Sequence, residues 1–98
     1  MLRRYVVERN LPKIGAASTG ELRKAAVRAR EALAELGTAI QWVESYICGD
    51  KAYCVYLAEC EELVRRQSEM VGMPVDALNE VVRIIDPATA NAVTRLRA

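Results

Sequence analysis

The segment 40–56, IQWVESYICGDKAYCVY, most constrains the fold, because two runs of β-branched and aromatic residues flank Gly49 and Asp50. Such runs are typical of strands, and a Gly-Asp pair between them favours a two-residue turn. The segment therefore predicts an antiparallel hairpin. Because side chains alternate between the two faces of a strand, the turn also predicts which residues lie opposite each other.

One face of this hairpin is predicted to be rich in aromatic rings. With Cys48 opposite Lys51, the alternation pairs Tyr46 with Tyr53, Glu44 with Val55 and Trp42 with Leu57. The other face then carries Val43, Ser45, Ile47, Ala52, Cys54 and Tyr56. We expect the first face, with its rings around a single carboxylate, to hold the functional site.

The residues before the hairpin predict a strand and a helix. Arg3–Asn10 has the β-branched content of a strand. Ser18 and Glu21 have the spacing of a capping box at a helix start, and Gly37 is a typical helix end. Apolar residues recur between them at helical spacing, so an amphipathic helix is expected there.

The residues after the hairpin predict a second helix and a fourth strand. A helical stripe runs from Cys60 to Val71 and ends at Gly72. Asn79–Asp86 predicts a strand, and Ala88–Ala98 a short terminal helix with Asp86 as its cap. The whole order predicts one α+β domain over residues 1–98, a ferredoxin-like βαββαβ fold with a four-stranded antiparallel sheet and both helices on one face.

The composition excludes several classes of function. The chain has no histidine, which removes Ser-His-Asp and Cys-His catalysis and the helical two-histidine zinc motif. With 14 Lys and Arg against 13 Asp and Glu, no basic surface for nucleic acid or an acidic membrane is expected. No membrane span or signal peptide is evident, which predicts a cytoplasmic protein. Three cysteines spaced six residues apart predict reduced thiols rather than a disulfide framework.

The sheet face opposite the helices is expected to bind a second copy of the chain. Each aromatic side chain can bury ~150–250 Å², so three on one face match the largest apolar patch of a typical monomer, about 300–600 Å². Two-fold dimers are the commonest soluble oligomers. We therefore expect a homodimer of the dimeric α+β barrel type that encloses a cavity between the two sheets.

Glu44 is the carboxylate at the centre of this face. A carboxylate in apolar surroundings is costly unless it is paired, bound to a ligand or protonated. One interpretation is a salt bridge to Arg9, Arg83 or Lys51. The other makes Glu44 the acid, base or metal ligand of a pocket walled by the aromatic rings. Tyr46 and Tyr53 also have a purely structural interpretation, as a cross-strand packing pair.

Three stretches of the chain resemble the family catalogued as domain of unknown function 4242. They are YVVERNLP (5–12), LGTAIQWVESYICGDKAYCVYLA (36–58) and VVRIIDPATA (81–90). The resemblance covers nearly the whole chain and implies a small cytoplasmic dimer, and some members of that family are described as nickel-binding. Members often have a histidine where Glu44 stands and another near Gln67. Nitrogen ligands suit nickel, so nickel is a candidate cofactor here without any ligand assigned to it.

Two functions follow as hypotheses. The first is a homodimeric binding protein that holds a small organic ligand or a divalent metal on the helix-free face. Its ligand-binding residues would be Trp42, Glu44, Tyr46, Tyr53, Val55 and Leu57. The second is a cofactor-free enzyme of the cyclase or isomerase type, in which Glu44 transfers protons and Tyr46 or Tyr53 donates a hydrogen bond to a developing oxyanion. RNA-recognition motifs share the strand order, but KAYCVYL lacks the glycine and phenylalanine of their signature.

Overall fold

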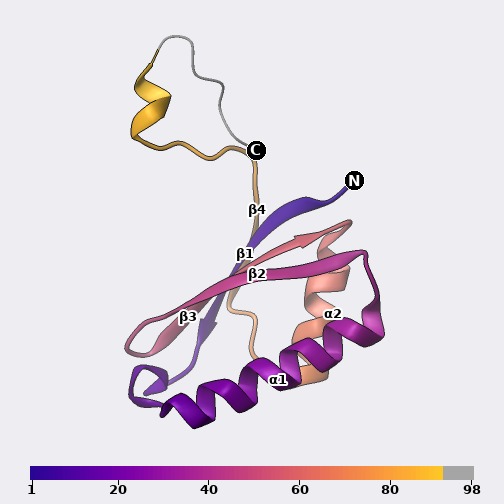
Figure 1. Cartoon of the computed structure of the whole chain (residues 1–98), viewed down its shortest axis with the longest axis vertical. Coiled ribbons are helices and arrows are strands. Elements are labelled where there is room, and N and C mark those ends of the chain that lie inside the picture. The colour runs from indigo at the N-terminus through magenta and orange to yellow at the C-terminus, as the bar shows by residue number, and fades with distance from the viewer. Residues whose placement is uncertain (92–98) are drawn as a thin grey trace.

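The computed structural model describes residues 1–91, which form an antiparallel sheet with two helices on one side (Figure 1). The strands are β1 (Arg3–Asn10), β2 (Ile40–Ile47), β3 (Lys51–Ala58) and β4 (Ala77–Val81). The helices are α1 (Thr19–Leu36) and α2 (Glu61–Val71), with short 3-10 helices η1 (Ile14–Ala16) and η2 (Pro87–Ala90). The strand order β2-β3-β1-β4, antiparallel throughout, confirms the predicted ferredoxin-like α+β fold. None of the helices in the described part of the chain is long and apolar enough to cross a membrane.

Helix α1 begins and ends where the sequence predicts. The backbone N–H of Glu21 donates to Ser18 Oγ at 3.1 Å, and the Ser18 N–H donates to Glu21 Oε1 at 3.3 Å. This capping box satisfies amide groups that would otherwise lack a partner at the helix start. Gly37 follows the last turn with φ 84°, a backbone conformation that favours glycine.

The hairpin has the predicted turn, and its register agrees with the prediction from Glu44 to that turn but not before Glu44. The Cys48 N–H donates to the Lys51 carbonyl at 2.8 Å across the two-residue turn. The expected pairs of Tyr46 with Tyr53 and Glu44 with Val55 are both present. The pairing predicted for Trp42 with Leu57 is wrong, because Trp42 lies opposite Tyr56.

A bulge at Val43 causes this difference. The register shifts between Trp42 and Glu44, so two residues of β2 occupy the space opposite one residue of β3. Every side chain before the bulge therefore faces the side opposite to the one predicted by simple alternation. Trp42 points toward the helices and packs against the core.

Strand β4 is earlier and shorter than the predicted strand at Asn79–Asp86. It pairs with β1 from Glu8 opposite Ala77 to Arg4 opposite Val81, and β1 begins only one residue before Arg4. The chain beyond Val81 thus runs out of partner strand and leaves the sheet (Figure 1). Asp86 does cap a helix, the 3-10 helix η2, while residues 92–98 of the predicted terminal helix lie outside the described residues.

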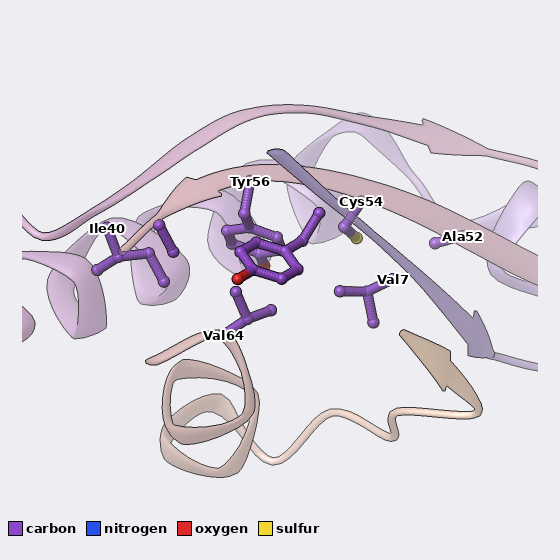
Figure 2. Close-up of a cluster of buried hydrophobic side chains, with 8 residues drawn as sticks. Val7, Ile40, Ala52, Cys54, Tyr56 and Val64 are labelled. Atoms are coloured by element: carbon purple, nitrogen blue, oxygen red, sulfur yellow. The ribbon is translucent and has the colours of Figure 1, made fainter. Parts of the chain in front are cut away.

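The core lies between the sheet and the two helices (Figure 2). Alternate residues of β1 and β3 point into it, and Val64 of α2 contacts them from the other side. Its buried members are Tyr5, Val7, Ile40, Ala52, Cys54, Tyr56, Ala58 and Val64. The remaining residues of β1 and β3 point to the opposite, helix-free face.

We expect Gly15→Ala to lower the free energy of unfolding by about 1–3 kcal/mol. A Cβ atom on Gly15 would lie 2.6 Å from the Cys48 carbonyl oxygen and 3.0 Å from Gly49 Cα, so the hairpin turn would have to move. Gly20→Ala is the matched control, because the nearest atom to its new Cβ is Ser18 Oγ at 3.8 Å. The control should be neutral or stabilising by up to about 1 kcal/mol. Urea unfolding measures both, and equal effects would contradict the packing of Gly15 on the turn.

Candidate functional site

The helix-free face brings together side chains from all four strands. Its rows, read from β2 to β4, are Gln41-Leu57-Arg4-Val81, Glu44-Val55-Val6-Asn79 and Tyr46-Tyr53-Glu8-Ala77. Five of the six predicted ligand-binding residues lie in these rows. Trp42 does not, and its predicted place on this face is wrong.

Glu44 and Tyr46 form a pair on this face. The Tyr46 hydroxyl donates a hydrogen bond to Glu44 Oε2, and both residues are exposed. This hydrogen bond, together with the negative charge of Glu44, raises the pKa of the Tyr46 phenol above its ordinary value. Tyr46 is therefore a protonated hydrogen-bond donor at neutral pH, and the carboxylate beside it is an acceptor.

None of the salt bridges predicted for Glu44 is found among residues 1–91. Arg9 is fully buried on the helix side of the sheet. Lys51 instead pairs with Glu8, with Nζ 3.0 Å from Oε2, and this contact raises the pKa of Lys51. Arg83 is exposed and makes no salt bridge within the described part of the chain.

Arg4 adds a cation to the same face. Its Nε is buried and has no hydrogen-bond partner among the described residues, which is an unusual state for a guanidinium nitrogen. The charge of Arg4 also acts on Tyr46, where it opposes the effect of Glu44 on the phenol pKa. The face thus carries the carboxylate of Glu44, the carboxylate of Glu8 paired with Lys51, two phenols and the Arg4 guanidinium around the apolar side chains of Val55 and Val6.

Trp42 lines a cavity on the other side of the sheet, which the sequence analysis did not predict. The indole Nε1–H donates to Ser45 Oγ at 2.9 Å. The cavity measures about 190 Å³ and lies between the sheet and the small-residue stripe of α1, formed by Ala25, Ala26 and Ala29. That stripe was visible in the sequence, but the inward turn of Trp42 depends on the bulge.

A buried polar network adjoins the inner end of this cavity. The Arg9 guanidinium donates to the Pro74 carbonyl at 2.9 Å, to the Tyr56 hydroxyl at 3.1 Å and to Cys54 Sγ at 3.4 Å. The Tyr56 hydroxyl in turn donates to Gln67 Oε1 at 2.9 Å. Burial raises the pKa of Tyr56, although the charge of Arg9 opposes this. The alternation of Tyr5, Val7 and Arg9 along β1 is the sequence signal that could have placed Arg9 inside.

The described residues do not fit a nickel ion within one chain. No group of three or more His, Cys, Asp or Glu side chains in residues 1–91 is placed to hold a metal. Cys48 is exposed, Cys54 is buried and Cys60 is half-buried, so the three thiols lie in different environments. Imidazole nitrogen suits nickel, and the helix-free face has oxygen atoms and a guanidinium in its place.

Comparison with known proteins identifies the family of the chain. Residues 5–81 match the family described as nickel responsive protein SCO4226-like. The chain belongs to the SCO4226-like family. The expected resemblance to domain of unknown function 4242 is compatible with this assignment and stays a prediction.

The SCO4226-like chain also resembles a solved structure. A crystal structure of SCO4226 from Streptomyces coelicolor A3(2) superimposes with a TM-score of 0.67 at 16% sequence identity. The similarity covers 81% of this chain and 95% of that chain. At this low identity the likeness shows the fold alone. No curated protein matches the sequence.

We expect Glu44→Gln to lower the pKa of Tyr46 toward that of an ordinary tyrosine. The substitution removes the negative charge that holds the phenol proton, so Tyr46 should ionise at lower pH than in the unaltered protein. NMR titration of ring-labelled tyrosine measures this pKa directly. Glu59→Gln, an exposed carboxylate just after β3, is the control and should leave Tyr46 unchanged. An unaltered titration in Glu44→Gln would disprove the hydrogen bond.

Proposed function

We propose that this member of the SCO4226-like family is a small homodimeric binding protein of the dimeric α+β barrel type. In this proposal two helix-free faces meet and enclose a small organic ligand. The observation that carries it is the grouping of Glu44, Tyr46, Tyr53 and the unpaired Arg4 Nε on a face that no helix covers. Val55 and Leu57 would supply apolar contacts at its centre.

The composition of the face supports pairing with a second copy. Val6, Val55 and Leu57 adjoin one another in the register, and Tyr46 is 54% exposed beside them. A two-fold contact requires a surface that is complementary to itself, and a face that carries both Glu44 and Arg4 has the charges for such a match.

The donor set favours an organic ligand over nickel. Carboxylate, phenol and guanidinium groups around apolar side chains suit a polar organic molecule, which needs both donors and acceptors. The family description as nickel responsive is the support for a metal, and the described residues of one chain provide no cluster of three ligands for it. A nickel ion would therefore have to be shared between two copies.

A cofactor-free enzyme of the cyclase or isomerase type is the alternative. It would use the same Glu44 for proton transfer and Tyr46 or Tyr53 as the hydrogen-bond donor. The Glu44–Tyr46 hydrogen bond provides the geometry for such a pair, since the carboxylate orients the phenol. The fold alone adds no support for a reaction, because related folds carry many functions. Binding is therefore the function that we propose.

We expect light scattering to give a mass of about twice 10.9 kDa at micromolar concentration. Tyr46→Asp should shift the protein toward a monomer, because it adds a second carboxylate beside Glu44 in the proposed interface. Val27→Asp places the same charge on the exposed side of α1, where Val27 is 43% exposed, and should leave the mass unchanged. A monomeric unaltered protein would rule out the proposed assembly.

We expect a nickel titration to give no saturable heat signal in calorimetry at micromolar protein. The reason is the lack of a three-ligand cluster in residues 1–91. Glu44→Ala is the informative variant. A saturable signal that disappears in Glu44→Ala, while Glu59→Ala retains it, would show instead that Glu44 holds the metal and would overturn our choice of an organic ligand.

A further inference from the structure

The buried guanidinium of Arg9 has no negatively charged partner among the described residues. Arg9 is 0% exposed, and none of the salt bridges in residues 1–91 includes it. Its three hydrogen bonds go to a carbonyl, a hydroxyl and a thiol, which use three of the five N–H groups of the side chain. A buried cation that is solvated only by dipoles attracts an anion.

The direction of these hydrogen bonds leaves the side-chain amide N–H of Gln67 as a hydrogen-bond donor beside Tyr56. Because Arg9 donates to the Tyr56 oxygen, the Tyr56 proton points to Gln67 Oε1. This fixes the orientation of the Gln67 amide and leaves its Nε2 without a partner in the described part of the chain. Gln67 is only 1% exposed, yet it lines the cavity beneath α1. The amide of a buried side chain thus lies at the wall of that cavity.

The rest of the cavity is apolar. Tyr56 and Cys54 point from β3 toward the helices at its inner end (Figure 2), while Ala26, Trp42 and Ile47 are among its apolar lining residues. None of its lining residues is charged. The volume of about 190 Å³ exceeds the ~150 Å³ of an engineered apolar cavity that takes up benzene. A ring with one small polar substituent therefore has a suitable size.

We propose that this cavity is a second binding site, which takes a small aromatic or short-chain carboxylic acid with its carboxylate toward Gln67, Tyr56 and Arg9. The Gln67 amide donates to the carboxylate, and Arg9 directly behind Tyr56 supplies the compensating charge. The apolar body of the ligand lies against Trp42 and the alanines of α1. The site is on the opposite side of the sheet from Glu44, so it does not depend on the function proposed above.

Binding of benzoate and of benzyl alcohol to the full chain tests the site. The two probes have similar shapes, but only benzoate carries a charge at neutral pH. We expect the unaltered protein to bind benzoate about tenfold more tightly or better, because hydrogen bonds to charged groups are the stronger ones. ¹H–¹⁵N NMR titration measures both affinities, and the side-chain amide signal of Gln67 should shift with benzoate.

Three variants test where the probes bind and whether Gln67 causes the preference for benzoate. Gln67→Glu keeps the shape and the acceptor for Tyr56 but replaces the donor with a carboxylate, so benzoate should bind at least about tenfold more weakly while benzyl alcohol is unaffected. Ala26→Leu fills the cavity and should abolish binding of both probes. Ala34→Leu makes the same change on an exposed position of α1 that does not line the cavity, and should have no effect.

Several results would overturn the proposal. Equal affinities of the unaltered protein for the two probes would show that no anion site exists, and this comparison requires no variant. Changes in NMR chemical shift that are confined to Glu44 and Tyr46 would place the bound probe on the helix-free face instead. Retained binding in a folded Ala26→Leu would exclude the cavity. If Gln67→Glu did not fold, Ala26→Leu would still test whether the cavity is the binding site, and the comparison of the two probes would still test whether the site favours a carboxylate.

Discussion

Packing of both helices against one face of the sheet is the constraint on which the rest of this structure depends. It divides every strand into residues that belong to the core, such as Val7 and Tyr56, and residues that face away, such as Val6 and Val55. In a chain of this size, burial of a single sheet face supplies most of the available core. The residues of the second face are then free to serve binding, and in this protein they carry both charge and aromatic rings.

The buried polar network favours one arrangement of the small core. Arg9 joins β1 to β3 through Tyr56 and to the loop after α2 through Pro74, while Tyr56 extends the connection to Gln67 on α2. Apolar contacts alone tolerate many arrangements, whereas directional hydrogen bonds favour one. In this member of a family described as nickel responsive, Tyr56 and Gln67 of that network also line the cavity beneath α1.

Local signals predicted most of the fold. The strand at Arg3–Asn10, the capping box of α1 and the Gly49-Asp50 turn each depend on residues close together in sequence, and all three are confirmed. The start and length of β4 were wrong because they depend on where β1 ends, which is a property of the partner strand. The facing of Glu44 and Tyr46 was predicted from alternation and confirmed. The cavity was missed because it requires knowledge of both the bulge and the distance between α1 and the sheet.

The bulge at Val43 has an evolutionary consequence. Trp42 and Glu44 are two positions apart in sequence, but because of the extra residue between them their side chains lie on opposite sides of the sheet. Loss of that residue by a single codon deletion would remove the bulge and leave Trp42 opposite Tyr56 and Glu44 opposite Val55, each on the side of the sheet where it lies now. Descendants of this chain can therefore shorten β2 at position 43 without exchanging side chains between the two surfaces of the sheet.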